Sequence, residues 1–194
     1  MWCGGVGQAV LPDPPLTAII APEVADTMSS RRVLFLTFVC FCAAAPLSPA
    51  DPNLALGKPA IGSTTCNPEE GPEKAFNGSV SGGTGDKWCS AEDSKWLQVD
   101  LGGNFNVNRV VIQHAGAGGE NSDWNTRAFK IHVSTDGKKY TAVVNVTDNT
   151  QDTSEHKFEP VPARYVQLEV ITPTQDGDPA ARIYEFEVYG TAAK

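Results

Sequence analysis

A segment of sixteen residues, IQHAGAGGENSDWNTR at positions 112–127, gathers several side chains that could do chemistry. Asn and Arg side chains are planar and offer several hydrogen-bond donors, and a Trp ring offers a flat apolar face. Three glycines in the same segment let the backbone bend sharply. The segment is therefore a flexible turn, a catalytic loop or the binding edge of a rigid scaffold. The side chains of interest are His114, Glu120, Trp124, Asn125 and Arg127.

Catalysis finds little support in the rest of the chain. Cleavage of a glycosidic bond needs two carboxyl groups that face each other across a cleft, and no such pair stands out among the 23 acidic residues. The strained G-x-S-x-G turn of serine hydrolases does not occur in the sequence. His132 lies in an expected strand and His156 precedes one, and neither has a neighbour at metal-ligand spacing. We therefore expect a protein that is not an enzyme.

The elements that must position these side chains are short β-strands. Apolar and polar residues alternate in KWLQVDLG (95–102), which is expected to end at Gly102–Gly103, and VNRVVIQH (107–114) is rich in β-branched residues. The stretch 128–146 predicts a hairpin, because two alternating runs flank an Asp136–Gly137 turn.

Two further strands are expected in HKFEPVPARYVQLEVIT (156–172) and RIYEFEVYG (182–190). No segment has a sustained apolar stripe with the 3.6-residue period of a helix. Short strands separated by Gly, Pro and Asp turns predict an all-β protein, a single-domain sandwich or jelly roll over about 53–190. The interior of two packed sheets is filled by side chains, so we expect function on the loops at the sandwich ends.

The first fifty residues differ from the rest of the chain. Arg31 and Arg32 precede an apolar run of about thirteen residues, and small residues follow at 48–50. This pattern predicts a secretory signal peptide over residues 28–50, followed by a secreted mature domain over residues 51–194; the alternative is a buried core helix. Residues 1–27 are expected to be an over-extended start, with translation beginning at Met28, or a disordered leader.

The acidic balance of the chain limits its partners. The formal net charge is −8, and residues 51–194 carry 13 basic against 20 acidic side chains. Binding to nucleic acid or to anionic lipid needs a surplus of Lys and Arg, so neither is expected, and no membrane insertion of the mature domain is expected either. A neutral sugar or a cation is compatible with this charge.

Two cysteines lie in the mature region, Cys66 and Cys89. If the domain is exported, an oxidising compartment favours a disulfide between them. The bridge would close a loop of about two dozen residues and contribute roughly 3 kcal/mol. The alternative is a pair of free buried thiols.

Several ordered motifs resemble one known family. They are NLALGKPA (53–60), EKAFNGSVSGGTGDKWCS (73–90), KWLQVDLGG (95–103), FKIHVSTDGKKY (129–140), ARYVQLEV (163–170) and AARIYEFEVYG (180–190). Together they resemble a coagulation factor 5/8 type C (discoidin) domain, in the version found among family 32 carbohydrate-binding modules. The resemblance covers residues 53–190 and implies a galactose-binding-like jelly-roll β-sandwich, in agreement with the periodicity of the strands.

The resemblance also implies a structural Ca²⁺ site in the glycine-rich loop before Trp88. Calcium takes six to eight hard oxygen ligands, and an acid such as Glu185 inside an apolar strand is otherwise unusual. Asn77 stands where relatives often have Asp, which removes one charge and lowers the expected affinity. The alternative is a hydrogen-bonded turn without metal. The implied ligands are the side chains of Asn77, Asp86 and Glu185 and the backbone carbonyls of Lys74, Ser79 and Tyr184.

In sugar-binding relatives the loop at 114–127 carries polar donors beside an aromatic face. The resemblance therefore implies that His114, Glu120, Trp124, Asn125 and Arg127 contact the hydroxyl groups and ring of a glycan. Three alternatives stay open: a Trp124 buried under the loop, an Arg127 paired with Glu120 or Asp123, and a His114 that caps the strand end.

Two acidic loops share the expected rim of this end. They contain Glu69 and Glu70, and Asp176 and Asp178; a solvated acidic turn is favoured over ligand contact for each.

These features favour an exported, non-catalytic carbohydrate-binding module whose partner is a glycan or polysaccharide. Such modules often accompany a glycoside hydrolase, which is a possible partner here. The alternative function is an extracellular adhesion domain that binds a protein surface. A lipid surface is less favoured, because the loops are rich in Gly, Asn and acids and lack basic residues beside exposed apolar ones.

Overall fold

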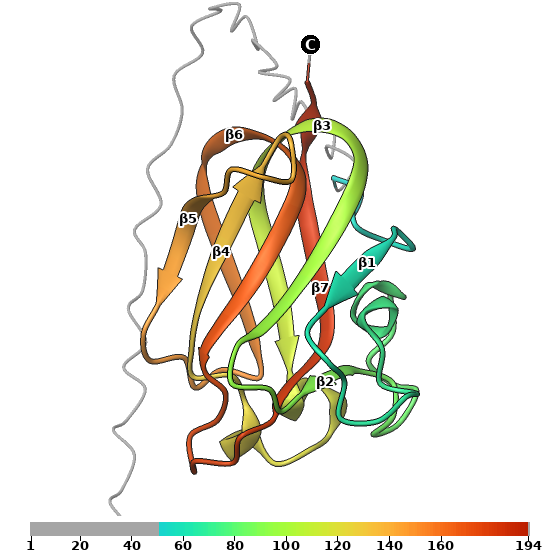
Figure 1. The fold of residues 1–194 in the computed structure, drawn as a ribbon, viewed down its shortest axis with the longest axis vertical. Helices are drawn as coiled ribbons and strands as arrows, with labels where there is room; N and C mark the ends of the chain where they lie inside the picture. The colour runs from blue at the N-terminus through green and yellow to red at the C-terminus, as the bar shows by residue number, and fades with distance from the viewer. Residues whose placement is uncertain (1–50, 194) are drawn as a thin grey trace, which may run out of the picture. The chain divides into compact units, whose positions relative to one another are not determined.

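Two long strands organise the fold. In the computed structural model, which describes residues 51–193, β3 (Lys95–His114) and β6 (Thr153–Thr172) each contain 20 residues and pair antiparallel along most of their length. Both strands bend at one end of the molecule, so that each contributes to two layers (Figure 1). The predicted signal peptide and start site lie outside the described residues.

Each layer is built from one half of each long strand. In the first layer the order is β1, the first half of β3, the second half of β6, β4 and β5. In the second layer the order is the first half of β6, the second half of β3, β7 and β2. The remaining elements are β1 (Ala60–Gly62), η1 (Pro72–Phe76), β2 (Trp88–Ser90), η2 (Ala115–Gly118), η3 (Ser122–Trp124), β4 (Ala128–Ser134), β5 (Thr141–Val146) and β7 (Ala181–Ala192).

The predicted end of a strand at Gly102–Gly103 is wrong. The strand bends there instead, because Gly102 has a φ of 82° and the register with β6 shifts between Asp100 and Phe105. The second half of the same strand then enters the other layer. In the same way β6 begins at Thr153, so His156 lies inside this strand and not before it.

The hairpin prediction is confirmed. β4 pairs with β5, and the turn between them is held by the Asp136 carboxylate, which accepts hydrogen bonds from the N–H groups of Lys138 at 2.8 Å and Lys139 at 2.9 Å. Gly137 adopts a φ of 70°, a conformation that glycine takes at little steric cost.

The core lies between the two layers. Apolar side chains alternate with polar ones along the strands, so one face of each strand is buried, as at Leu97, Val99 and Leu101. Burying an aliphatic or aromatic side chain of this size contributes about 1.5–3 kcal/mol. The largest fully buried apolar side chains are Trp88, Phe76, Phe129, Phe186, Leu97, Leu101, Ile112, Ile131, Leu168 and Ile183.

A disulfide joins Cys66 to Cys89, as predicted, with a Cα–Cα distance of 5.4 Å. It ties the loop after β1 to strand β2. The short helices η2 and η3 also lie at this end of the sandwich, which is the lower end in Figure 1. We call it the loop end. Within residues 51–193 no helix is long and apolar enough to cross a membrane.

Candidate functional site

The loop between β3 and β4 is an ordered structure and not a flexible turn. It forms the short 3-10 helices η2 and η3. Gly119 ends η2 with a φ of 86°, and its N–H donates to the carbonyl of Gly116 at 3.0 Å. The side chain of Asn121 accepts the N–H of Asp123 at 3.0 Å and so begins η3.

Asn125 lies completely buried beneath this loop. Its amide oxygen accepts the N–H of Gly116 at 2.8 Å, and its amide nitrogen donates to the Asp152 carboxylate at 2.8 Å. Its backbone carbonyl accepts a hydrogen bond from the side chain of Gln175 at 2.9 Å. Asn125 therefore does not contact a ligand as predicted. It supports the loop instead, because both polar groups of its side chain bind neighbouring loop residues.

His114 is also completely buried, and burial lowers its pKa to about 3. Its Nε2 lies 3.0 Å from Ser154 Oγ, which lies 3.1 Å from His156 Nε2. Burial also lowers the pKa of His156, so both rings are neutral at pH 7. Although Ser and His are together here, Ser154 is only 7% exposed and no substrate cleft opens above it among the described cavities. We assign this cluster to the support of the loop, and His114 is not placed for direct contact.

Trp124 lies on the surface of the loop end and is partly exposed, so it is not buried under the loop. Its indole N–H donates to Asp176 at 3.1 Å, and the guanidinium of Arg182 lies 4.4 Å from the ring centre. Such a cation–π contact fixes the orientation of the indole. Trp124 is therefore an aromatic side chain held in place on the rim, which is the position predicted for a stacking face.

Arg127 is exposed and forms an ion pair with Asp148 at 2.8 Å. Neither of the expected alternative partners, Glu120 and Asp123, pairs with it. With 46% of its side chain exposed, Arg127 remains accessible at the edge of the loop end.

Glu120 is not free to accept a ligand hydrogen bond, because three protein groups already contact it. Lys87 lies 3.1 Å away, Arg182 lies 3.6 Å away, and the Tyr184 hydroxyl donates to it at 2.7 Å. Its side chain is 9% exposed. The predicted contact residue thus joins the loop to the residue before β2 and to strand β7.

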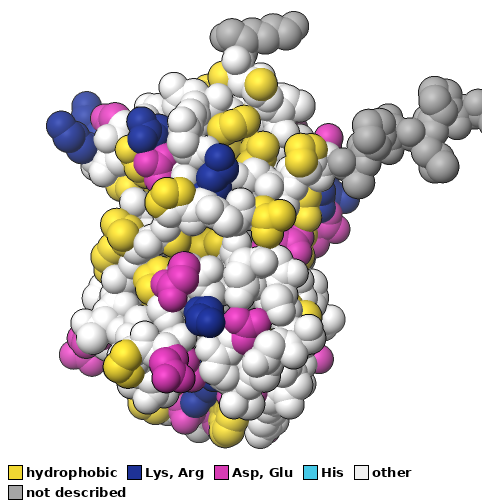
Figure 2. Space-filling model, turned by 90° about the vertical axis from the view of Figure 1, so that its right-hand side faces the viewer, with side chains coloured by type: hydrophobic (Ala, Val, Ile, Leu, Met, Phe, Trp, Pro, Cys, Tyr) yellow, Lys and Arg dark blue, Asp and Glu magenta, His cyan; other side chains and the backbone are white. Residues whose placement is uncertain are grey.

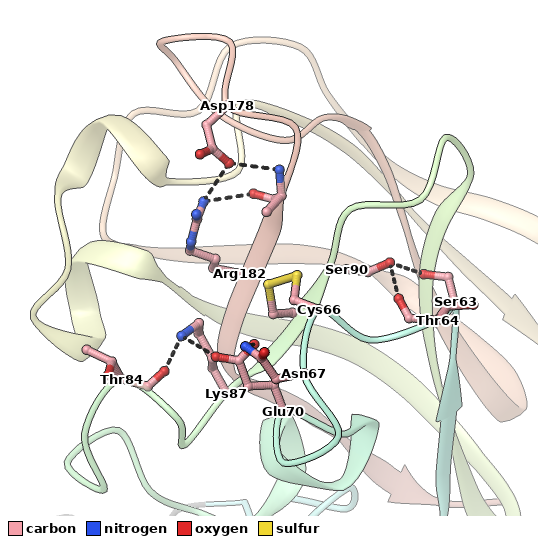
Figure 3. The surroundings of a disulfide bond; sticks show 12 residues. Ser63, Thr64, Cys66, Asn67, Glu70, Thr84, Lys87, Ser90, Asp178 and Arg182 are labelled. Carbon is pink, nitrogen blue, oxygen red and sulfur yellow. Dashed lines mark hydrogen bonds and ion pairs between the residues drawn. A yellow bond between two sulfur atoms is a disulfide. The ribbon is translucent and has the colours of Figure 1, made fainter.

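Glu120 is the centre of a chain of ion pairs that we name the rim network. It consists of Glu70, Lys87, Glu120, Arg182 and Asp178. Lys87 also contacts Glu70 at 3.0 Å, and Arg182 contacts Asp178 at 3.1 Å. Figure 3 shows two of these pairs, Lys87–Glu70 and Arg182–Asp178, near the disulfide.

The rim network corrects the prediction for two acidic loops. Glu70 and Asp178 were expected in solvated turns, whereas Glu70 is 8% exposed and both are paired. Sequence reasoning missed Lys87 and Arg182. A buried lysine has no local pattern that marks it, although Lys87 does stand directly before a strand that contains a buried Trp and a Cys.

An open cavity of about 350 Å³ lies beside the rim network. Glu70 lines this cavity and accepts a hydrogen bond from Asn67 at 3.0 Å, whereas Glu69 is exposed. Carboxylates of this kind accept hydrogen bonds from hydroxyl or ammonium groups. The cavity is lined by Asn67, Pro68, Glu69, Glu70 and Gly85.

The predicted calcium ligands Asn77, Asp86 and Glu185 are brought together in a second place. The Asn77 amide nitrogen donates to Asp86 at 2.7 Å, and the N–H of Gly78 donates to Glu185 at 3.0 Å. Glu185 is 2% exposed, and its Oε1 has no hydrogen-bond partner among the described residues. Burial, together with the nearby charges of Glu187 and Asp86, raises the pKa of Glu185 to about 7.

The three residues predicted to supply carbonyl ligands lie in η1, in the loop itself and in β7. Lys74 lies in η1, and its ammonium group is 3.8 Å from Asp86. Ser79 donates its N–H to the side-chain oxygen of Asn77 at 2.8 Å. Tyr184 precedes Glu185 in β7, and its hydroxyl points to the rim network. A buried carboxylate with an unused oxygen beside a second acid fits a hard cation, so the donor set is suitable for Ca²⁺.

Comparisons with known proteins agree with this architecture. A family model described as F5/8 type C domain matches residues 60–186. The chain is similar to the family 32 carbohydrate-binding module from Streptococcus pneumoniae EndoD, with 29% identity and a TM-score of 0.61 over 72% of this chain and 100% of that one. No match is found among curated proteins.

Two further structures have the same fold and have been solved with sugars. The lectin domain of lectinolysin, complexed with Lewis B antigen, is 27% identical with a TM-score of 0.62, over 73% of this chain and 98% of that one. Chitosan-binding module 2 of a chitosanase/glucanase from Paenibacillus sp. IK-5, in complex with chitotriose, is 25% identical with a TM-score of 0.60, over 71% and 100%. The chain folds into the expected two-layer β-sandwich, and the family model matches residues 60–186. The chain therefore belongs to the F5/8 type C domain family.

Proposed function

We propose that this protein is an exported, non-catalytic glycan-binding domain that uses the loop end around Trp124. One observation carries the proposal: a partly exposed indole is held in a fixed orientation by Asp176 and Arg182. A pyranose ring presents apolar C–H groups on one face and hydroxyl groups at its edge. A fixed aromatic ring with a carboxylate beside it suits both, and its rigidity lowers the entropy cost of binding.

The neighbouring cavity extends the proposed site. Glu69, which is exposed, would accept hydrogen bonds from sugar hydroxyls there, and the exposed Arg127 would donate to a hydroxyl elsewhere on the glycan. Similar solved domains include modules and lectin domains that bind chitotriose and Lewis B antigen, which supports glycan as the ligand class. A shallow site of this kind binds weakly on its own, and several copies on one surface raise the avidity.

A glycan array probed with the protein tests the proposal. We expect binding to at least one glycan and a loss of about tenfold or more in Trp124→Ala, since aromatic anchors dominate such interfaces. Asp176→Asn should weaken binding less, and Glu159→Gln, an exposed acid near the bend of β6 at the other end of the sandwich, serves as the matched control. Binding that survives Trp124→Ala unchanged would contradict the site. Absence of glycan binding together with capture of a protein ligand would favour the adhesion function.

We also propose that the Asn77 loop holds a structural Ca²⁺. The side chains of Asn77, Asp86 and Glu185 would supply oxygen ligands, with backbone carbonyls of Lys74, Ser79 and Tyr184. When bound, the ion would neutralise the two carboxylates and join the loop to β7. The unused Oε1 of Glu185 supports the proposal, because a buried carboxylate oxygen without a partner is costly.

Export is the third part of the proposal. The Cys66–Cys89 bridge and the domain family of the chain both support an oxidising, extracellular location. The predicted signal peptide over residues 28–50 would then be removed, and N-terminal sequencing of the secreted protein should begin near Asp51. Recovery of the protein only inside the cell, with residues 28–50 still attached, would contradict export. A glycoside hydrolase is a proposed partner, which co-purification from the secreted fraction tests.

A further inference from the structure

A second cavity lies on the outer face of the first layer, away from the loop end. Its volume is about 230 Å³, which is room for about seven water molecules at ~30 Å³ each. It opens where β1, only three residues long, leaves the edge of the sheet. Its lining comes from three neighbouring strands and the residue before β1, namely Pro59, Ala60, Ile61, Gln98, Asp100 and Tyr165.

The apolar part of this lining includes a large hydrophobic side chain that is mostly exposed to solvent. Ile61 is 57% exposed, and it is one of three large hydrophobic residues with this property in the described part of the chain. It pairs across the strands with Gln98, and Tyr165 pairs with Asp100 on the other side. Hydrophobic side chains gather mainly on the upper half of the face that carries β1 (Figure 2). The cavity therefore has an aliphatic and an aromatic wall.

The polar groups in the cavity are fixed by contacts behind them. The Tyr140 hydroxyl donates to the side-chain oxygen of Gln98 at 2.6 Å, so the amide nitrogen of Gln98 points elsewhere. Arg164 binds both oxygens of Asp100 at 2.8 Å, which cancels the charge of this carboxylate and holds it in place. The cavity thus offers the planar amide donor of Gln98 beside a carboxylate whose charge is neutralised.

The aromatic wall is positioned by the β4–β5 turn. A Cβ atom on Gly137 would lie 3.2 Å from the ring of Tyr165, so the absence of a side chain there leaves room for the ring. Gln167, which pairs with Gln98 on β6, extends the polar surface along the sheet and is partly exposed.

We propose that this cavity is a second glycan-binding site, which takes one sugar unit of a neutral polysaccharide against the sheet face. The Tyr165 ring and the aliphatic side chains would cover C–H groups, while the amide nitrogen of Gln98 would donate to a hydroxyl. A protein ligand would demand a larger apolar area than a cavity of this volume. A charged sugar would find no unpaired charge in the lining.

The two sites lie at opposite ends of the first layer. Lys95 begins β3 near the loop end, and Asp100 is five residues further, or about 16 Å at ~3.3 Å per residue. A single polysaccharide, or two of them, could therefore occupy both sites of one molecule, and the second binding event would be favoured by proximity. This inference does not depend on the proposed function of the loop end, because a different set of residues carries it.

Nuclear magnetic resonance of the isotope-labelled protein tests the second site directly. The probes are neutral hexasaccharides of β-1,4-linked glucose, xylose and mannose. We expect at least one of them to shift the amide signals of Gln98, Asp100 and Tyr165 in a saturable way. No saturable shift at these three residues with any of the probes would overturn the proposal.

Variants distinguish this site from the loop end. Tyr165→Ala and Gln98→Leu should each weaken the shifts by about tenfold, or about 1.4 kcal/mol. Ile61→Ser should weaken them several-fold, whereas Ile171→Ser, an equally exposed isoleucine at 52%, should not. Trp124→Ala should leave them unchanged. Equal weakening by Ile61→Ser and Ile171→Ser, or loss in Trp124→Ala alone, would overturn the proposal, and thermal melting confirms that each variant is folded.

Discussion

The molecule contains two clusters of acidic side chains that differ in how their charges are satisfied. In the rim network each carboxylate has protein partners, and Glu120 alone contacts Lys87, Arg182 and Tyr184. In the Asn77 loop Lys74, 3.8 Å from Asp86, is the only cation in contact among residues 51–193, and within the same residues one oxygen of Glu185 has no partner. The first cluster is complete without a ligand, and the second is not.

This difference separates support from binding. A complete network orients loops, and removal of one member leaves a buried charge without a partner, which destabilises the fold. An incomplete cluster is open to an added cation, and its stability should depend on that ion. The same number of acids near the surface can therefore have different roles, and the hydrogen-bond partners decide which.

The largest expected effect comes from the complete cluster. Lys87→Met removes the buried ammonium from between Glu70 and Glu120 and should lower the free energy of unfolding by about 3–5 kcal/mol, measured by urea denaturation. Lys157→Met, which removes an exposed pair with Glu155, should cost less than about 1 kcal/mol. If Lys87→Met lowered the free energy of unfolding as little as Lys157→Met does, the rim network would not stabilise the fold.

The disulfide is the covalent part of the same region, and its loss ranks second. Cys66→Ser with Cys89→Ser should lower the free energy of unfolding by about 3 kcal/mol, because the closed loop restricts the unfolded chain. Urea denaturation of the double variant measures this change, with the reduced wild-type protein as its reference. If neither the double substitution nor reduction of the wild-type protein changed the free energy of unfolding, the disulfide would not contribute to stability.

Calcium should stabilise the protein only through the incomplete cluster. At a free concentration one hundred times its Kd, Ca²⁺ should add about 2.7 kcal/mol, seen as a rise in Tm that a chelator reverses. Glu185→Gln should remove the rise, whereas Glu69→Gln, an exposed acid beside the rim network, should keep it. A rise that persists in Glu185→Gln would place the ion elsewhere.

The smallest effect is the pH dependence of that binding. The pKa of Glu185 is raised to about 7 from its usual 4.5, so the ion-free folded state binds more protons than the unfolded state between these values. Stability without calcium should therefore fall as pH rises through this window, and calcium must displace the proton below pH 7. Calcium affinity should drop about tenfold, or about 1.4 kcal/mol, for each pH unit below 7. Calorimetric titration measures it, and Glu185→Gln should lack this dependence.

Much of the fold follows from local patterns in the sequence. Alternating residues give the strands, Asp136–Gly137 gives the hairpin turn, and Cys66 and Cys89 have only each other as partners in the described region. These features depend on a few neighbouring residues. The continuity of β3 through Gly102 was not predictable, since a glycine pair can end a strand or bend it, and only the packing of both layers selects the bend.

The sequence by itself determined the fold class, the family and the loop that carries Trp124. Only the tertiary structure decided which polar residues of that loop face outward. His114 and Asn125 are donors by type, yet both are buried and used, while Lys87 and Arg182, from distant parts of the sequence, hold the rim network. The physical reason is that a polar group is available to a ligand only if no protein group already satisfies it, and those partners lie far away in the sequence.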